Sequence, residues 1–246
     1  MIKAVIFDLD GTLIQTEVLK ARSYAKAINQ LTEGRILEEK VLKGFSSYVG
    51  LSRMEVVEGL YLEFMNELAM VYPARKADFI RQAIISKRLE IYRDMINDAG
   101  LLSGFFCPFN IGLLNSLHKD GYITALATMS HEQEATRMLD IMKIRDKLSV
   151  VVTRDSVATG KPDPEIYLKV SGMLGIMPEE CLVIEDSVNG IKAAVSAGMT
   201  VFAVTNGITR ESVHKAEIID TKYIIDYLEE LKPRIYSFIE QLKYKE

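Results

Sequence analysis

The sequence predicts an α/β protein with a Rossmann-like, doubly wound parallel sheet as its core and an all-α helical cap inserted into that core. Five short apolar runs bounded by turn residues recur along the chain, and helix-period segments separate the later runs. The stretch 16–100, which follows the first run, shows helical periodicity and no strand-like run. Because strands and helices alternate elsewhere, this helical stretch is expected to be an insert.

The apolar runs indicate buried parallel strands, because each is short and almost continuously apolar. One predicted helix begins at Asp163-Pro164 and ends near Gly175, and another is capped by Ser187 and stops at Gly198. Both helices lie between apolar runs, as the crossovers of a parallel sheet require. The five predicted strands are Ala4–Phe7, Ile123–Ala127, Leu148–Val152, Leu182–Ile184 and Thr200–Val204.

The stretch 16–100 predicts a small bundle of amphipathic helices, since apolar residues recur at spacings of three or four within 18–31, 56–68 and 80–96. We therefore predict two domains. Residues 1–15 and 101–246 form the Rossmann-like catalytic core, and residues 16–100 form the helical cap domain. The tail 223–246 is expected to add one or two helices without a catalytic role.

Composition excludes several classes of protein. With 48% hydrophobic and 26% charged residues, the 246-residue chain is neither disordered nor fibrous. A net charge of -4 gives no basic excess for non-specific nucleic-acid binding. No apolar run approaches the roughly 18 residues of a membrane helix, and Asp8 cuts the first run before a signal-peptide core could form, so we expect a cytoplasmic protein. Cys107 and Cys181 are isolated, which predicts neither a disulfide framework nor a zinc site.

Acidic residues follow two of the predicted strands. Asp8 and Asp10 come directly after the first run, and Glu185 and Asp186 follow the fourth. Parallel strands end at the same edge of a sheet, which is where open α/β folds bind ligands. Two carboxylates about 4 Å apart repel each other by roughly 4 kcal/mol at an effective dielectric constant near 20, so a cation is expected among them. Oxygen ligands without nearby His or Cys favour Mg²⁺.

Groups able to bind a phosphoryl group follow the second predicted strand and precede a predicted helix. Thr128 and Ser130 supply hydroxyl groups after the second run, and Lys161 supplies a positive charge before the next helix. Each feature has a simpler explanation alone: a turn at Asp10-Gly11, helix caps at the hydroxyls, a solvated lysine, a polar exit from the core. Their order along one sheet edge favours a phosphoryl-transfer site.

These motifs resemble those of the haloacid dehalogenase superfamily, and the resemblance extends over nearly the whole chain. The helical insert is similar to the cap of the β-phosphoglucomutase-like branch. The resemblance therefore implies a Rossmann-like core with an inserted helical cap and a Mg²⁺-dependent chemistry. It rests on Asp8–Leu13, Thr128, Gly160–Pro164, Glu185–Ser187, Asn189-Gly190 and Ala197–Met199.

The resemblance implies a role for each core residue. Asp8 would be the nucleophile that forms an aspartyl-phosphate, and Asp10 would protonate the leaving alcohol and then activate water. Lys161 and Thr128 would bind the transferring phosphoryl group. An acid at Asp10 favours phosphate esters over haloacids, because a departing halide needs no proton.

The same resemblance implies the residues that hold Mg²⁺ and the substrate. The metal ligands would be Asp8, the backbone carbonyl of Asp10, Asp186 and Glu185. The implied substrate-binding residues are Gly11, Thr12, Ser130 and His131 in the core, and Arg53 and Lys20 in the cap. For His131, an exposed loop position is the simpler alternative.

The cap residues decide the substrate, and here the sequence departs from the sugar-phosphate mutases. Gly50–Arg53 resembles the cap segment whose Arg binds the non-reacting phosphate, although a helix start with Ser52 as its cap and Arg53 in solvent explains it equally well. Lys20 stands where those mutases have His, and Gln15 stands where Asp is usual. A further departure is Pro108–Asn110, where many relatives have Pro-Gly.

The sequence therefore predicts a Mg²⁺-dependent phosphatase that acts on a small phosphorylated metabolite such as a sugar phosphate. One alternative is a β-phosphoglucomutase-like phosphosugar mutase, which begins with the same chemistry at Asp8. An alternative of another class is a non-catalytic phosphate-binding or regulatory protein on the same fold. The expected partner is the small phosphorylated substrate, and the chain is expected to be a monomer or a homodimer.

Overall fold

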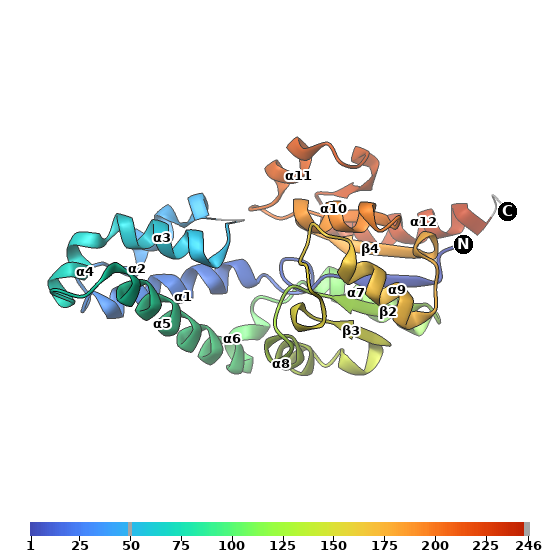
Figure 1. Cartoon of the computed structure of the whole chain (residues 1–246). Helices are drawn as coiled ribbons and strands as arrows, with labels where there is room; N and C mark the ends of the chain where they lie inside the picture. The colour runs from blue at the N-terminus through green and yellow to red at the C-terminus, as the bar shows by residue number, and fades with distance from the viewer. Residues whose placement is uncertain (49–50, 244–246) are drawn as a thin grey trace. The chain divides into compact units, whose positions relative to one another are not determined.

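A computed structural model of the protein describes residues 1–48 and 51–243. The chain folds into two compact units (Figure 1). We call Met1–Gln15 together with Ser103–Glu246 the core, and Thr16–Leu102 the cap. The cap is inserted directly after the first strand of the core, so the core is built from two separate pieces of the sequence.

Six strands and the helices between them form the core. Three-residue turns of 3₁₀ helix connect several of these elements. The strands are β1 (Ala4–Phe7), β2 (Ile123–Ala127), β3 (Val150–Val152), β4 (Cys181–Glu185), β5 (Thr200–Val204) and β6 (Ile224–Ile225). The helices are α7 (Pro108–Lys119), α8 (Glu132–Met142), α9 (Glu165–Leu174), α10 (Val188–Ser196), α11 (Arg210–Ala216) and α12 (Leu231–Lys243).

The six strands form one parallel sheet in the order β3-β2-β1-β4-β5-β6. Strand β1 lies in the middle, where Ala4 is paired with Ile123 of β2 on one side and Cys181 of β4 on the other. The strand order reverses on either side of β1, which makes the carboxyl ends of β1, β2 and β4 the expected ligand crevice.

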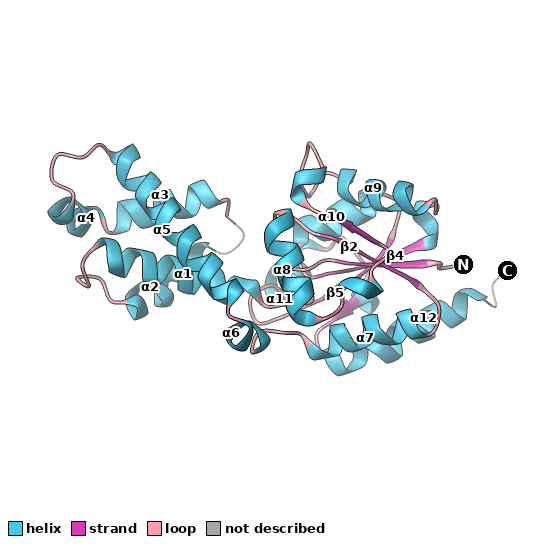
Figure 2. Ribbon diagram, turned by 90° about the horizontal axis from the view of Figure 1, so that it is seen from below, coloured by secondary structure: helices cyan, strands magenta, loops and turns pink. Residues whose placement is uncertain are grey.

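Helices cover both faces of the sheet (Figure 2). On one face, Ala4 and Ile6 of β1 belong to a buried cluster with Ile166 of α9 and Ile191 of α10. Helices α7 and α12 lie on the opposite face. The strands are apolar throughout because both of their faces are buried in this way.

The cap consists of helices, as its periodicity predicts. Ile28 of α1, Leu60 of α3 and Ile84 of α5 meet in its own apolar core. Ser52 caps α3 with a capping box, accepting from Glu55 N at 3.3 Å while Glu55 Oε2 accepts from Ser52 N at 2.7 Å. The cap helices are α1 (Thr16–Leu31), α2 (Glu38–Gly44), α3 (Arg53–Glu63), α4 (Met65–Val71) and α5 (Ala77–Asn97), and α6 (Ala99–Ser103) leads back to the core.

The predicted fold class is confirmed: a parallel sheet carries a helical insert after its first strand. Three of the predicted strands have the observed bounds, whereas β3 begins later because the N–H of Leu148 still bonds to Arg145 O in a 3₁₀ turn. The sequence missed β6, which has only two residues, and the short helix α2. The periodic stretch 56–68 is interrupted at Phe64, between α3 and α4. Among the described residues, no helix is long and apolar enough to cross a bilayer.

Candidate active site

The carboxyl end of β1 delivers Asp8 into the middle of the sheet edge. Its side chain is buried, and Oδ1 accepts a hydrogen bond from Lys161 Nζ at 2.7 Å. The chain then turns sharply at Gly11, whose φ of +88° is the left-handed conformation that favours glycine. Gln15 closes this turn by donating to Gly11 O at 3.1 Å and to Cys107 Sγ at 3.3 Å. The turn thus fixes where Asp8 and Asp10 lie.

Glu185 ends β4, beside Asp8, and is fully engaged. Its Oε2 accepts from the backbone N–H groups of Asp186 and Ser187, each at 2.8 Å, and from Ser187 Oγ at 3.0 Å. Its Oε1 accepts from Lys161 Nζ at 2.6 Å and from Tyr167 OH at 3.2 Å. Five donors therefore satisfy the two oxygens of this one buried carboxyl group, as a polar group in the interior requires.

Lys161 links the two acids. Besides Asp8 and Glu185, its ammonium donates to the carbonyl of Ala127 at the end of β2, at 3.1 Å. An ammonium has three N–H donors, so these three acceptors use all of them. The Lys161 side chain is only 5% exposed, which excludes the solvated lysine as an explanation.

The pKa values of Asp8 and Lys161 are both raised, for different reasons. Burial raises the pKa of Asp8 to about 8, repulsion from Glu185 and Asp10 adds to this, and attraction to Lys161 opposes it. Burial alone would lower the pKa of Lys161, but the attraction of Asp8 and Glu185 outweighs it and holds that pKa well above its ordinary value. Lys161 is therefore a permanent cation, whereas Asp8 needs a further positive charge to be an anion at neutral pH.

The acidic cluster formed by Asp8, Glu185 and Asp186 fits a metal ion. Each residue offers a carboxylate oxygen, and these oxygens lie within 4.8 Å of one another in a buried position. Two glycines make room for the acids: a Cβ on Gly11 would lie 2.0 Å from Asp186 Oδ2, and one on Gly190 would lie 1.7 Å from Glu185 Oε1. All donors in the cluster are hard oxygens, the type preferred by Mg²⁺.

The Asp10 carboxylate is separate from that cluster and faces two hydroxyl groups. Its Oδ2 accepts from Ser130 Oγ at 2.6 Å and from Thr128 Oγ1 at 3.2 Å. Thr128 Oγ1 in turn accepts from the backbone N–H of Ser130 at 3.0 Å. Neither hydroxyl caps a helix, because α8 begins after His131 and without a side-chain cap. The carboxylate of Asp10 is thus held by hydroxyl groups and is not one of the three carboxylates of the acidic cluster.

Thr12 and His131 occupy different surroundings. Thr12 is fully buried beside the turn, its backbone carbonyl accepts from Asn110 Nδ2 at 2.6 Å, and its hydroxyl finds no hydrogen-bond partner in the described part of the chain. His131 is half-exposed and its Nδ1 lies 2.7 Å from Asp155 Oδ1. Asp155 also accepts from the first N–H of α8, that of Glu132, at 2.8 Å. The contact of His131 therefore supports the start of a helix.

The cap contributes a cluster of cations around Tyr24. Burial raises the pKa of Tyr24, and the positive charges of Arg88, Arg53 and Lys20 oppose that rise, which places all three within electrostatic reach of its hydroxyl. Arg53 is the exposed first residue of α3. Lys20 forms an ion pair with Glu17 at 2.7 Å. Gly50, predicted to belong to the same anion-binding segment, lies outside the described residues.

Arg88 is the cation in this cluster that the sequence did not single out. It lies on α5, only 6% exposed, with its guanidinium 5.0 Å from the ring centroid of Tyr24 and 4.6 Å from that of Tyr92. Its Nε finds no hydrogen-bond partner among residues 1–48 and 51–243. A buried arginine is normally paired with an acid, and here two tyrosine rings lie where such a partner is usual.

Two residues near the acids were also missed. Asn206 follows β5, and its Nδ2 lies 3.5 Å from Asp186 Oδ2; applying the strand-end rule to the fifth run would have found it. Tyr167 lies on the face of α9 that its periodicity assigns to the core, so no sequence signal distinguishes it from an ordinary apolar position.

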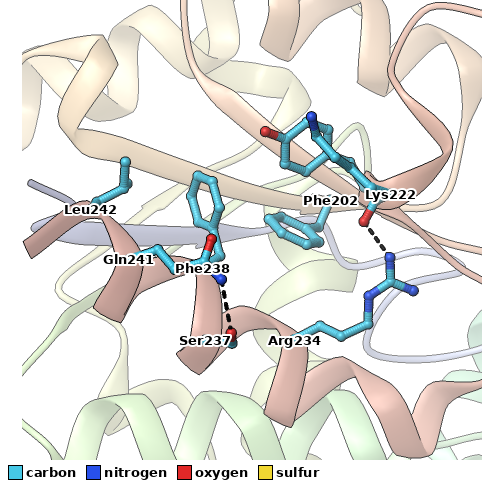
Figure 3. Close-up of a pocket in the computed structure, with 8 residues that line it drawn as sticks. Phe202, Lys222, Arg234, Ser237, Phe238, Gln241 and Leu242 are labelled. Atoms are coloured by element: carbon cyan, nitrogen blue, oxygen red, sulfur yellow. Dashed lines mark hydrogen bonds between the residues drawn. The ribbon is translucent and has the colours of Figure 1, made fainter. Parts of the chain in front are cut away.

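A pocket of about 390 Å³ lies in the core between α12 and the segment that leads into β6, apart from the acids described above (Figure 3). Its wall contains the rings of Phe202, Tyr223 and Phe238, which pack edge to face with centroids 5.1–5.9 Å apart. Arg234 donates to the backbone carbonyl of Lys222 at its rim. Among the described residues, no carboxylate and none of the predicted site residues lines this pocket.

A parallel sheet with a buried acid after its first strand, a lysine bound to it and further acids at the end of β4 is the arrangement that the motifs predict for a hydrolase. The chain matches the haloacid dehalogenase-like hydrolase family over residues 5–204, and it belongs to that family. The family and the enzyme class predicted from the motifs are thereby confirmed.

Similar proteins include both phosphatases and mutases. A phosphorylated carbohydrates phosphatase from Thermotoga maritima is 30% identical over 200 residues, which are 80% of this chain and 82% of that protein. A beta-phosphoglucomutase from Bacillus subtilis is 32% identical over 209 residues, 83% of this chain and 84% of that protein. The crystal structure of a beta-phosphoglucomutase from Clostridium difficile matches with a TM-score of 0.63 at 26% identity, over 97% of this chain and 99% of that one.

Proposed function

We propose that the protein is a Mg²⁺-dependent phosphomonoesterase that hydrolyses a small, sugar phosphate-like metabolite. The observation that carries this proposal is that two acids, only two residues apart in the sequence, have different surroundings. Asp8 is buried against Lys161 within the acidic cluster, whereas Asp10 is held by the hydroxyls of Thr128 and Ser130. A nucleophile and a separate acid–base group are what hydrolysis of an ester through a covalent intermediate requires.

In the first step, a carboxylate oxygen of Asp8 attacks the phosphorus atom of the ester. A bond forms between Asp8 and phosphorus while the bond from phosphorus to the alcohol oxygen breaks. Asp10, in its protonated form, gives its proton to that oxygen, so a neutral alcohol leaves. Lys161 and Thr128 stabilise the charge that builds up on the phosphoryl oxygens.

In the second step, water attacks the phosphorus of the aspartyl-phosphate. Asp10, now a carboxylate, accepts the proton of that water, and the bond between phosphorus and Asp8 breaks. Inorganic phosphate leaves, and both acids return to their initial states. The hydroxyls of Ser130 and Thr128 keep the Asp10 carboxylate in one orientation for both proton transfers.

Asp8, Glu185 and Asp186 would hold Mg²⁺, together with the backbone carbonyl of Asp10. When bound, the ion would supply positive charge that offsets the negative charge of the acids and of the phosphoryl group. Such a charge would also lower the raised pKa of Asp8, since a cation beside this carboxyl group favours its ionised form. The role of Glu185 is twofold here, because it also binds Lys161.

The cap supports a substrate with a second anionic group. Arg53, Lys20 and the buried Arg88 bring three positive charges to one region of the cap. We assign Arg53 and Arg88 to binding of a phosphate or carboxylate that does not react. The phosphatase and mutase relatives have names that refer to phosphorylated carbohydrates, which agrees with such a substrate.

The deciding experiment measures two products at once. The protein is incubated with MgCl₂ and glucose 1-phosphate, with and without a bisphosphate primer, and inorganic phosphate and glucose 6-phosphate are assayed separately. A panel of other phosphate esters follows. Release of inorganic phosphate that stops with EDTA and returns with MgCl₂ supports the phosphatase; isomerisation without release identifies a mutase; no turnover of any ester identifies a non-catalytic phosphate-binding protein.

A further inference from the structure

Tyr167 of α9 contacts both members of the buried Lys161–Glu185 ion pair. Its side chain is fully buried, in one apolar cluster with Ile166 and Val170. Its hydroxyl donates to Glu185 Oε1 at 3.2 Å, and the Lys161 ammonium lies 5.0 Å from the centroid of its ring. The hydroxyl group of Tyr167 therefore binds the acid of this ion pair, and its ring lies beside the cation.

The hydroxyl group of Tyr167 is not needed for packing, because a Phe ring would fill the same space. Burying a hydroxyl group costs free energy unless it forms a hydrogen bond. Here the hydrogen bond goes to a charged oxygen, which is the stronger kind. The hydrogen bond to Glu185 therefore offsets the cost of burying this hydroxyl group.

The two oxygens of Glu185 differ in how firmly they are held. Three donors, from Asp186 and Ser187, fix Oε2 to the start of α10. Only Lys161 and Tyr167 bind Oε1. Without the Tyr167 hydroxyl, Oε1 would depend on Lys161 alone and would draw the ammonium toward Glu185.

Lys161 has no spare donor in this arrangement, because Asp8, Ala127 and Glu185 use its three N–H groups. To bind a phosphoryl oxygen, the ammonium must give up one of these bonds. If its bond to Glu185 were strengthened, the ammonium would be held away from Asp8, where the phosphoryl group is transferred. The second donor at Glu185 Oε1 limits that pull.

We infer that Tyr167 is a positioning residue: by sharing Glu185 Oε1 with Lys161, its hydroxyl keeps the ammonium directed at Asp8 and the transferring phosphoryl group. This inference rests on the proposed roles of Asp8 and Lys161. Tyr167 touches no reacting atom and acts only through Glu185 and Lys161. Its effect falls on the step in which charge builds up on the phosphoryl oxygens, so it affects kcat more than KM.

The first test is Tyr167→Phe, which keeps the ring and removes the hydroxyl. We expect kcat with an aryl phosphate to fall roughly 10-fold, as for loss of one hydrogen bond to a charged group, and KM to change less than about 2-fold. The matched control is Tyr223→Phe. Tyr223 is another aromatic residue of the core, and its hydroxyl makes no hydrogen bond to a described residue, so kcat should not change.

A second readout separates positioning from loss of packing. Glu185 belongs to the acidic cluster. In a thermal-shift titration, Tyr167→Phe should therefore raise the MgCl₂ midpoint, which is the MgCl₂ concentration at which half of the increase in Tm has occurred. Val170→Ala removes packing from the same helix and cluster without touching Glu185. It should lower Tm but leave kcat per folded molecule and the MgCl₂ midpoint unchanged. Equal midpoints for the two variants would overturn the inference.

A double variant tests the route through Glu185. If the hydroxyl acts through that carboxylate, Tyr167→Phe adds nothing to the loss of kcat caused by Glu185→Gln, whereas additive losses overturn the inference. Failure of the inference is distinguishable from failure of the proposed function. An active wild type whose Tyr167→Phe variant keeps its kcat and its MgCl₂ midpoint refutes only the positioning role. A wild type that hydrolyses no ester refutes the proposed function and this role with it.

Discussion

The carboxyl edge of the sheet and the basic cluster of the cap are both charged, but they are built differently. At the sheet edge, Lys161 has all its donors in use and Glu185 accepts from five groups. In the cap, Arg53 is exposed and the buried Arg88 keeps an Nε without a partner among the described residues. The contrast teaches that the charged groups of the core are fixed by their own contacts, whereas those of the cap leave donors for the ligand that we propose.

The difference has a physical reason. Stabilising a transition state requires dipoles and charges that are already in place, because reorganising them would add to the barrier. Recognising a substrate requires donors that the substrate itself satisfies, so that a molecule lacking the group leaves them unpaired. Substitutions in the core should therefore reduce turnover of every substrate, and those in the cap should discriminate between substrates.

The most severe test of the core is Asp8→Asn, which removes the proposed nucleophile. We expect turnover of any ester to fall by about 10⁴-fold or more, since losing a nucleophile removes the covalent route itself. The assay is release of p-nitrophenol from p-nitrophenyl phosphate, with circular dichroism to check the fold. Activity retained by this variant would show that Asp8 is not the nucleophile.

Asp10→Asn should have the next largest effect and depends on the leaving group. General acid–base catalysis typically contributes 10²–10⁴-fold, so we expect a loss of about that size with a sugar phosphate. The loss should be smaller with p-nitrophenyl phosphate, whose leaving group needs no proton. Equal losses with both esters would contradict the role of Asp10 as the acid.

In the cap, Arg53→Ala should separate substrates by charge. For esters with a second anionic group we expect kcat/KM to fall roughly 10-fold, the size of one lost charged contact, with little change for p-nitrophenyl phosphate. Arg35→Ala is the control, because Arg35 is a cap arginine paired with Glu33. If Arg53→Ala weakens both kinds of ester alike, Arg53 belongs with the exposed residues of a helix start.

The smallest expected effect concerns stability in the absence of metal. The pKa of Asp8 is about 8 in the folded chain and lies near its ordinary value of 3.8 when unfolded, so the folded state binds the extra proton between these values. The stability that Asp8 contributes is therefore complete below pH 3.8 and is lost as the pH rises toward 8.

Thermal unfolding in EDTA checks this sign. Asp8→Asn carries no such titration, so its Tm should exceed that of the wild type by an amount that grows from pH 5 to pH 8 and then levels off. We expect a gain of several degrees at pH 8, and MgCl₂ should reduce it by stabilising the wild type. A gain that shrinks with rising pH would mean that the Asp8 pKa is not raised.

The sequence was most informative where local chemistry and strand position coincide. Asp8, Thr128, Lys161 and Glu185 each follow or precede an apolar run, and a parallel sheet necessarily gathers such positions at one edge. The bonds among them could not be predicted in the same way. That Ser130 binds Asp10 depends on the exact geometry of the segment after β2 rather than on spacing along the chain.

Contacts that depend on packing between distant segments could not be predicted from the sequence. Helical periodicity assigns Tyr167 to the core correctly, but it cannot show that one end of a core residue touches a carboxylate. Arg88 presents the opposite case, since an arginine on a helix is expected in solvent and here stacks between two tyrosine rings. Both positions depend on contacts between helices and strands far apart in the sequence.

The central place of β1 determines when this protein can mature during synthesis. Its two neighbours are β2 and β4, and Ala4 must wait for Ile123 and then for Cys181 to be translated. The cap has its own apolar core and is complete once Leu102 is made, so it should fold first on the ribosome. Pulse proteolysis of chains arrested after residues 147 and 210 should find a protected cap in both and a protected β1 only in the longer one. Asp8, at the end of β1, is thus made before the cap but enclosed only after the cap has folded.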